Sequence, residues 1–219
     1  QNLFCENQYG FRPKHSTVNA VTEFVYKTLS SLDNDKSTLA TFLDLSKAFD
    51  TIDHTIMLDK LSYYGIRGVA LQWFRSYLTN RKQYVSVLGV TSDTMEVNCG
   101  VPQGSVLGPL LFILFINDMK LCVSGSIIRF FADDTRILRH IRSYADSCIL
   151  QQDLNSVIKW AKENNMALHE DKFELMVHKH CPQNSLFEHP FAILDQTYQV
   201  SRSYYCNEIY KNIESSKKT

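Results

Sequence analysis

Two adjacent aspartates, Asp133 and Asp134, interrupt an apolar stretch that runs over residues 127–138. The segments rich in Ile and Phe on either side predict a β-hairpin with both carboxylates at its turn. Neighbouring carboxylates repel each other unless a positive charge lies between them. A hard divalent cation such as Mg²⁺, which takes oxygen ligands, is the obvious candidate. For the pair alone, ordinary turn chemistry is the simpler interpretation.

A third aspartate, Asp44, ends a second strand-like run over residues 37–44. A carboxylate at the end of an apolar strand costs desolvation free energy unless it has a partner. Phosphoryl transfer through two divalent ions about 4 Å apart needs carboxylates that come from different strands. Asp44 and the Asp133–Asp134 pair meet this need if their strands are neighbours. The predicted order β-α-α-β-β-α-β contains the elements that place them so.

The spacing of apolar residues predicts the elements that must position these aspartates. We expect Ser16 or Thr17 to cap the first helix and Ser105 to cap the fourth. A turn near residues 89–93 joins the two strands that precede the fourth helix. The expected helices cover residues 18–32, 55–64, 69–78, 105–119 and 146–163, and the expected strands cover 37–44, 83–88, 94–98 and 173–178 around the hairpin.

The segment Gly100-Val101-Pro102-Gln103-Gly104-Ser105 predicts a turn whose glycines let the backbone approach a ligand closely. The helix that follows presents free N–H groups, which suit phosphate. The glycines are too few for a Walker loop, so a nucleotide-binding loop of that kind is not expected.

The composition fits one large domain or two small ones, because 44% of the 219 residues are hydrophobic. A formal net charge of zero argues against a nonspecific basic coat for nucleic acid. A local basic face is still predicted over residues 60–92, where every charged residue is a lysine or an arginine; a solvated helix face is the alternative. These residues are Lys60, Arg67, Arg75, Arg81 and Lys82.

The six cysteines are scattered and form no CxxC pair, which predicts reduced thiols inside a cell. A zinc site at His178, His180 and Cys181 is disfavoured because no second ligand pair has a suitable spacing. The longest apolar stretch, residues 106–116, is too short to span a bilayer and contains glycine and proline. We therefore expect an intracellular protein, in the nucleus or the cytoplasm, without a membrane partner.

Five segments of the chain resemble, in order, the sequence motifs of reverse transcriptases. They are Asn7 to Thr17 with its Gly-Phe-Arg-Pro for the fingers, Phe42-Leu43-Asp44-Leu45-Ser46-Lys47-Ala48-Phe49-Asp50 for the first palm motif, Gly100-Val101-Pro102-Gln103-Gly104-Ser105-Val106-Leu107-Gly108-Pro109 for the second, Phe131-Ala132-Asp133-Asp134 for the third and Lys172 for the fourth. Lys47-Ala48-Phe49-Asp50 and Ile116-Asn117-Asp118 favour the non-LTR, LINE-type retrotransposon branch over retroviruses.

The resemblance covers about residues 7–180 and implies an α+β fold. In this fold a polymerase palm-type antiparallel sheet is backed by helices and joined by a partial fingers segment. We expect the partial fingers over residues 1–36 and the catalytic palm over 37–180. Residues 181–219 would be the end of the palm or the start of a truncated thumb, with a disordered tail over 215–219.

The resemblance also implies a metal site. Asp44, Asp133 and Asp134 would be the metal carboxylates, and the carbonyl oxygen of Leu45 would be a further ligand. The implied cofactor is a pair of Mg²⁺ ions, with Mn²⁺ as an alternative.

Substrate contacts are implied at further positions. Phe49 falls where the family places a steric gate, a ring that clashes with a ribose 2′ hydroxyl; a core aromatic is the alternative. Gln103 and Gly104 would border the nucleotide and the template. The remaining candidates are Arg12 and Lys172, for contacts to the triphosphate of the dNTP or to the backbone. Arg75, Arg81 and Lys82, in the segment from Trp73 to Lys82, are candidates for contacts to template or primer phosphates.

The implied function is that of an RNA-directed DNA polymerase, which acts on an RNA template, a DNA primer and dNTPs. Because the chain starts at Gln1 rather than Met, we expect a fragment or one domain of a longer protein. The earliest fingers motif would precede Gln1 and no thumb pattern follows Cys181, so weak or no activity is expected of the 219 residues alone. A catalytically dead remnant that only binds nucleic acid is the alternative. An RNA-dependent RNA polymerase is disfavoured by Phe49.

Overall fold

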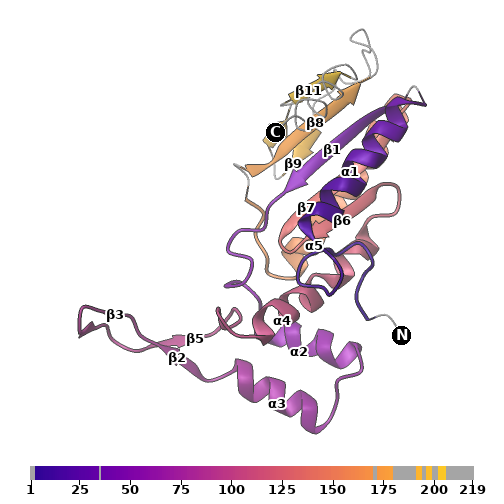
Figure 1. Ribbon diagram of the computed structural model, residues 1–219. Helices are drawn as coiled ribbons and strands as arrows, with labels where there is room; N and C mark the ends of the chain where they lie inside the picture. Colours follow the sequence, from indigo (N-terminus) through magenta and orange to yellow (C-terminus); the bar gives the residue numbers. More distant parts are fainter. Residues whose placement is uncertain are drawn as a thin grey trace.

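The protein alternates helices with short strands (Figure 1), and the computed structural model describes residues 3–34, 36–169, 172–179, 191–193, 196–198 and 202–205. In chain order the elements are α1 (Thr17–Leu32), β1 (Ser37–Leu43), α2 (His54–Tyr63), α3 (Val69–Leu78), β2 (Arg81–Gln83), β3 (Ser86–Val87), β4 (Val90–Thr91), β5 (Met95–Val97), α4 (Leu107–Phe115), the 3₁₀ helix η1 (Asn117–Cys122), β6 (Ile127–Phe131), β7 (Asp134–Ile141), α5 (Tyr144–Glu163), β8 (Glu174–Lys179), β9 (Phe191–Ile193), β10 (Gln196–Tyr198) and β11 (Arg202–Tyr205).

A five-stranded sheet in the order β11-β8-β1-β7-β6 forms the centre of the fold. The middle strand, β1, is antiparallel to both of its neighbours, β7 and β8, and β6 is antiparallel to β7. Strand β11 adds to β8 in the parallel direction. The antiparallel palm-type sheet that the sequence predicted is therefore confirmed.

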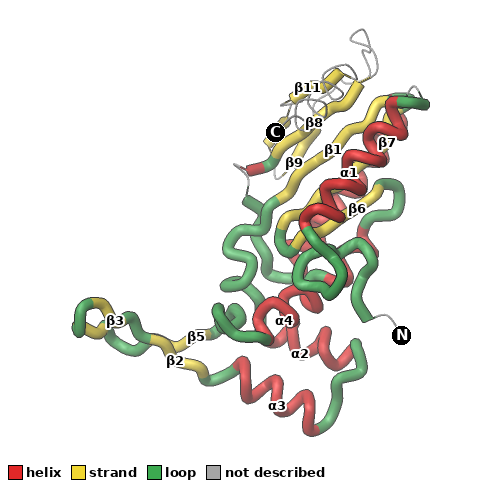
Figure 2. Tube along the Cα trace, in the orientation of Figure 1, coloured by secondary structure: helices red, strands yellow, loops and turns green. Residues whose placement is uncertain are grey.

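Both faces of this sheet are covered at β1. Successive side chains of β1 point to opposite faces, so each face has its own packing partners. Leu39 and Leu43 belong to the large buried cluster that includes residues of α4 and α5. Phe42 points to the other face, where its ring lies 6.1 Å from that of Phe24 in α1. Figure 2 shows α1 across the front of the sheet and the connecting loops at one end of it.

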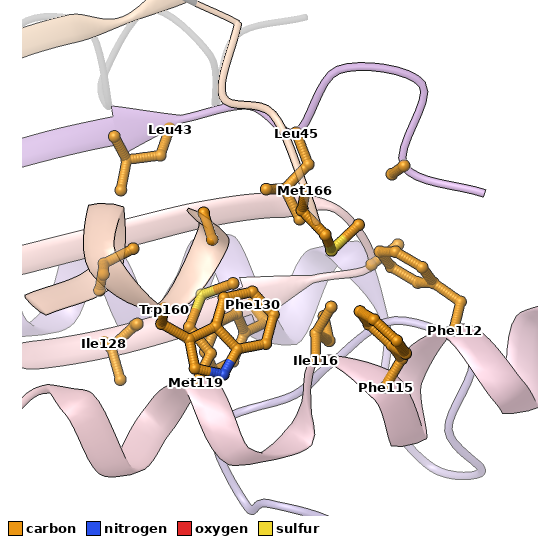
Figure 3. Packing of buried hydrophobic residues seen from close by; sticks show 14 of the residues in the cluster. Leu43, Leu45, Phe112, Phe115, Ile116, Met119, Ile128, Phe130, Trp160 and Met166 are labelled. Atoms are coloured by element: carbon orange, nitrogen blue, oxygen red, sulfur yellow. The ribbon is translucent and has the colours of Figure 1, made fainter. Parts of the chain in front are cut away.

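Helix α4 is buried on nearly all sides, as expected of a helix that is hydrophobic all round. Phe112 and Phe115 are fully buried, and Figure 3 shows Phe115 between Phe112 and Ile116. The ring of Phe115 lies 6.5 Å from that of Trp160 in α5. In Figure 1, α2 lies between α4 and α3, and a ribbon made of β2 to β5 projects sideways from these helices.

Lys60 of α2 is buried beneath this helical layer, with only 11% of its side chain exposed. Its Nζ donates to the carbonyl oxygen of Phe115 at 2.6 Å and to Asp118 Oδ1 at 2.7 Å. The ammonium also lies 4.5 Å from the ring centre of Phe115 and 4.7 Å from that of Trp160. Burial lowers the pKa of Lys60, and its hydrogen bond to Asp118 opposes the shift. Lys60 is thus a structural cation, and its predicted place on an exposed basic face is wrong.

The predicted caps and turns differ from the structure in detail. Ser16 caps α1 by accepting a hydrogen bond from the Asn19 N–H. Helix α4 starts at Leu107 and ends earlier than predicted, because the chain tightens into η1. The Ser105 hydroxyl still accepts a hydrogen bond from the Gly108 N–H at 3.0 Å.

The ribbon is less regular than the two strands predicted for it. Strands β2 and β5 pair at its base, and β3 and β4 pair at its tip. The turn lies at Leu88 and Gly89, which have φ angles of 50° and 82°, and so precedes most of the predicted range of 89–93. Positive φ at both central positions matches the twist of a two-residue hairpin turn.

Other sequence predictions meet the structure only in part. His178 is buried in β8, whereas His180, Cys181 and the tail over 215–219 lie outside the described residues. Within the described part of the chain, four cysteines are free and no helix is both long and apolar enough to cross a bilayer. The proposed boundaries at residues 36 and 180 stay predictions, although α1 packs directly on the sheet.

The two-sided burial of β1 generates a stability prediction. We expect Leu39→Ala to lower the free energy of unfolding by about 2–5 kcal/mol, because Leu39 is fully buried and the deletion leaves a cavity. The matched control is Leu88→Ala at the ribbon tip, where the side chain is 100% exposed and the change should stay within about 0.5 kcal/mol. Urea unfolding of the 219-residue chain measures both. Equal losses would contradict the assignment of β1 to the core.

Candidate active site

The register of β1 against β7 brings the three predicted aspartates to one end of the sheet. Leu43 pairs with Thr135, so Asp44 continues β1 past the point where the hairpin begins. Phe131 pairs with Asp134, which leaves Ala132 and Asp133 as the two residues of the turn. The hairpin predicted from the apolar runs is therefore present, with Asp133 in the turn and Asp134 as the first residue of β7.

A cavity of about 250 Å³ lies at this end of the sheet. It brings together six of the predicted site residues from four separate segments of the chain. The lining residues are Asp44, Leu45, Ser46, Lys47, Ala48, Phe49, Asp50, Gln103, Asp133, His169 and Lys172. Asp134 is exposed beside the cavity and does not line it.

The electrostatics of the cavity depend on Asp133 and Asp44. Burial raises the pKa of Asp133; its own backbone N–H opposes this shift, and the charges of Asp134 and Asp44 add to it. Lys172 Nζ lies 2.6 Å from Asp44 Oδ2, and this hydrogen bond and charge raise the pKa of Lys172. One ammonium thus neutralises Asp44, while Asp133 keeps an unfavourable charge that a further cation would stabilise.

The oxygen atoms around the cavity fit a hard divalent cation. Carboxylates and backbone carbonyls are the ligands that Mg²⁺ and Mn²⁺ prefer. Leu45 forms a bridge to Leu168 through hydrogen bonds from Ser46 N to Ala167 O and from His169 N to Asp44 O. Neither bond uses the Leu45 carbonyl oxygen, which is the predicted backbone ligand.

The acidic residues do not converge on one point in this structure. Among the residues described, no three His, Cys, Asp or Glu side chains are close enough together to hold a metal ion. Asp44 is paired with Lys172 instead, and Asp134 points to solvent at the start of β7. The donor chemistry therefore fits a divalent ion, and the three-carboxylate ligand set stays a prediction.

Phe49 takes part in both the core and the cavity wall. Its ring stacks on Phe112 of α4, with 4.5 Å between centres, and meets the edge of Phe11 at 6.0 Å. The same half-buried residue lines the cavity. The core and gate interpretations of Phe49 are thus compatible, because one side of the ring packs while the residue still faces the site.

The loop over residues 100–105 is held against the segment that carries Phe49. Gln103 Nε2 donates to Asp50 Oδ1 at 2.7 Å, and a Cβ on Gly100 would lie 2.8 Å from backbone atoms of Asp50. Gly100 therefore permits a close approach to the chain itself rather than to a ligand, which corrects the sequence interpretation. Gly104, with φ of 77°, is open to solvent and outside the cavity lining.

A second and larger cleft, of about 810 Å³, opens from the active-site cavity toward the base of the ribbon. The two share Lys47, Asp50 and Gln103. Arg81 and Lys82 line the larger cleft, as their predicted contact with nucleic-acid phosphates requires. The exposed Arg75 in α3 lines neither.

Arg12 lies away from the cavity. Its Nη1 donates to the carbonyl oxygens of Cys5 at 2.7 Å and Gln8 at 3.3 Å. The guanidinium also lies 5.7 Å from the ring centre of Phe4. In this structure Arg12 therefore holds the N-terminal loop together, and its predicted contact with the triphosphate gains no support.

Sequence reasoning missed several residues of the site. Lys47, Asp50 and His169 line the cavity, and each lies within a quoted motif segment or close to one, which was the available signal. Gln8 was also missed. It is 3% exposed and contacts the hairpin turn from the N-terminal segment, an arrangement that no local pattern indicates.

Comparisons with known proteins find similar sequences and a similar fold. Residues 1–202 match the family model described as reverse transcriptase (RNA-dependent DNA polymerase). The chain is 32% identical over 173 residues to the RNA-directed DNA polymerase from mobile element jockey of Drosophila melanogaster, covering 75% of this chain and 19% of that protein. It is 32% identical over 183 residues to the probable RNA-directed DNA polymerase from transposon X-element of the same species, covering 78% and 19%. The chain thus spans about one fifth of the length of these relatives.

Two solved structures share the fold. Telomerase from Candida albicans, in complex with a TWJ fragment of telomeric RNA, matches with a TM-score of 0.59 and 12% identity over 85% of this chain and 33% of that one. Apo telomerase from Candida tropicalis matches with a TM-score of 0.60 and 9% identity over 88% and 36%. At these identities the likeness concerns the fold alone.

The unfavourable charge on Asp133 generates a prediction for the metal-free chain. We expect Asp133→Asn to raise the free energy of unfolding at neutral pH by about 0.5–2 kcal/mol, because it removes a half-buried charge that the charges of Asp134 and Asp44 also disfavour. The sign follows from the raised pKa, since the ionised form is the one that the fold disfavours. The same variant should lose any rise in melting temperature that Mg²⁺ gives the parent chain.

Thermal unfolding with and without Mg²⁺ measures both effects, and Asp59→Asn, at an exposed position of α2, is the matched control. A destabilised Asp133→Asn chain that still responds to Mg²⁺ would contradict the assignment.

Proposed function

The chain belongs to the reverse transcriptase (RNA-dependent DNA polymerase) family, and we propose that the cavity at Asp44 and Asp133 is its polymerase site. The reaction joins a dNTP to the 3′ hydroxyl of a DNA primer that is paired with an RNA template. One observation carries the proposal: two carboxylates, one just after β1 and one in the β6–β7 turn, line one cavity together with Phe49, Gln103 and Lys172. We also propose that the protein acts inside the cell, in the nucleus or the cytoplasm, where RNA and dNTPs are found.

Asp44 and Asp133 would hold a pair of Mg²⁺ ions, or Mn²⁺ in their place, with Asp134 and the Leu45 carbonyl as further ligands. Such ions lower the pKa of the attacking hydroxyl and neutralise charge on the leaving pyrophosphate. The chain itself supplies the sheet that positions the carboxylates. This matters because a two-metal site requires preorganised ligands.

Lys172 would bind phosphate oxygens of the incoming dNTP. Its side chain is 61% exposed and already reaches the cavity through its bond to Asp44. A lysine ammonium is a mobile point charge with three donors, so it can exchange a carboxylate for a phosphate without a change of fold.

Phe49 would exclude ribonucleotides. Its stacking on Phe112 fixes the ring at the cavity wall. A ring fixed in this way cannot move aside for a 2′ hydroxyl, so discrimination comes from a clash with the wrong substrate. Gln103 is tied to Asp50 beside it and would border the base pair being formed.

The larger cleft would receive the template–primer duplex. Arg81 and Lys82 lie at the ribbon side of this cleft, and it joins the catalytic cavity at Lys47 and Gln103. Phosphate contacts of this kind release counterions, so binding should weaken as the salt concentration rises.

A second candidate function is the binding of nucleic acid without catalysis. It is favoured by one observation, that the three aspartates do not form a metal site ready for binding among the described residues. The cleft with Arg81 and Lys82 would then be the functional surface, and the three aspartates would have no catalytic role.

Primer extension on an RNA template separates the two functions. It should be measured for the 219-residue chain and for the same chain extended in frame at both ends, because the matched part covers only 19% of the jockey relative. We expect Asp133→Ala to lower the rate by about a thousandfold, because it removes several kcal/mol of transition-state stabilisation. Asp59→Ala on the exposed surface of α2 is the control and should keep full activity.

Full activity of Asp133→Ala would remove that residue from the site. If neither length of the parent chain extends a primer but both bind the duplex, the second candidate function is the correct one.

The gate assignment has its own test. We expect Phe49→Ala to raise the incorporation of ribonucleotides relative to dNTPs by at least about tenfold, because the clash with the 2′ hydroxyl is removed. Phe24→Ala is the matched control, since Phe24 also makes an aromatic pair, with Phe42, but lies outside the cavity. Competition between labelled rNTPs and dNTPs gives the ratio directly. An equal loss of both activities in Phe49→Ala, with an unchanged ratio, would make Phe49 a core residue only.

A further inference from the structure

The segment Asn7–Gly10 lies along the outer edge of β6 and extends the sheet there. Gln8 forms a parallel bridge with Phe130. The Phe130 N–H donates to the Asn7 carbonyl, and the Tyr9 N–H donates to the Phe130 carbonyl, both at 2.9 Å. A segment far upstream in sequence is therefore fixed beside the strand that leads into the catalytic turn.

The side chain of Gln8 holds the turn itself. Its Oε1 accepts hydrogen bonds from the N–H groups of Gly10 at 2.7 Å and Ala132 at 3.1 Å. Its Nε2 donates to the Ala132 carbonyl oxygen at 3.4 Å. The carboxamide, which is almost completely buried, thus binds both backbone polar groups of the residue that precedes Asp133.

Ala132 is a position that needs such a restraint. Its φ of 53° lies in the left-handed region, which a residue with a Cβ disfavours. The backbone of Gly10 packs closely against the same residue, since a Cβ at Gly10 would lie only 2.3 Å from the Ala132 nitrogen. The turn is therefore closed from outside by backbone contact and by the Gln8 carboxamide together.

The N-terminal segment is itself anchored, so it can transmit this restraint. The Tyr9 hydroxyl donates to the Glu23 carboxylate in α1. Glu23 also accepts from Arg129 Nη2 at 2.6 Å and Nε at 3.0 Å. The hydrogen bond from Arg129 is the main cause that lowers the pKa of Glu23 to about 2, so the pair is ionised at neutral pH.

We propose that Gln8 is a positioning residue for Asp133. By fixing both polar groups of Ala132, it holds the turn in its left-handed conformation and directs the Asp133 carboxylate into the cavity. The proposal rests on the proposed polymerase function, because positioning has an effect only if Asp133 takes part in the reaction. A purely structural role, in which Gln8 satisfies the sheet edge, predicts loss of stability without a specific effect on the turn.

The test compares Gln8→Met, which keeps the length of the side chain but removes its hydrogen bonds, with Gln72→Met on the exposed surface of α3. We expect Gln8→Met to lower kcat for primer extension by about 10- to 100-fold, the effect of misplacing a reacting group by about 1 Å. The KM for dNTP should change little. In the metal-free chain, amide hydrogen exchange over residues 127–141 should become faster, and Gln72→Met should change neither quantity.

Two further variants keep the test decisive if Gln8→Met folds poorly. Gly10→Ala leaves Gln8 in place but pushes the segment off Ala132, and it should reproduce the loss of kcat. Ala132→Gly removes the cost of the left-handed conformation. Added to Gln8→Met, it should restore part of the lost kcat and part of the protection from exchange.

Three outcomes would overturn the positioning role. They are equal kcat values for Gln8→Met and Gln72→Met, unchanged exchange over residues 127–141, and a loss that follows the melting temperature and is not restored by Ala132→Gly. Failure of both lengths of the parent chain to extend a primer, or full activity of Asp133→Ala, would instead overturn the polymerase function on which the proposal rests. Amide hydrogen exchange over the turn distinguishes a failure of the positioning role from a failure of the polymerase function, because it can be measured in an inactive protein.

Discussion

The pairing of β1 with β7 is the constraint on which the rest of the structure depends. Leu43 stands opposite Thr135, and this register alone brings Asp44 to the end of the sheet where the hairpin turns. Both faces of β1 are covered, by α1 on one side and by the cluster that includes α4 and α5 on the other. A shift of one residue would exchange the two faces, so burial fixes the register and the register fixes the site.

Burial and charge oppose each other at this end of the sheet. Asp44, Asp50 and Asp133 line the cavity with Lys47 and Lys172, and burial raises the pKa of Asp133. Packing elsewhere must offset this cost, and the buried aromatic residues of α4 contribute to this packing. Phe49 joins the two parts of the molecule, since its ring stacks on α4 while the residue lines the cavity.

The hairpin and the end of β1 could be predicted because each leaves a local pattern, an apolar run that ends in an acid. The palm-type fold class and further site residues such as Phe49 and Lys172 were instead implied by the resemblance of the motifs to those of reverse transcriptases. The predicted role of Arg12 gained no support, because its guanidinium binds carbonyl oxygens of its own loop. Lys60 and Gly100 were interpreted wrongly because their partners are backbone atoms far along the chain. Gln8 was missed on the same grounds, as a glutamine has no preferred partner that a sequence could indicate. The ribbon forms two short strand pairs instead of the two longer strands predicted, because most of its side chains are exposed and do not pack against a core.

The long path between the paired strands determines when the site can form. Strand β6 and strand β7 are joined by two residues, so their hairpin closes locally and early. Strand β1 is separated from its partner β7 by α2, α3, the ribbon and α4, which are synthesised before β7. Closing so long a loop is slow. During synthesis on the ribosome, Asp44 would therefore emerge long before its neighbour across the sheet. We therefore expect the cavity to form after the β6–β7 hairpin, because it requires the more distant pairing of β1 with β7.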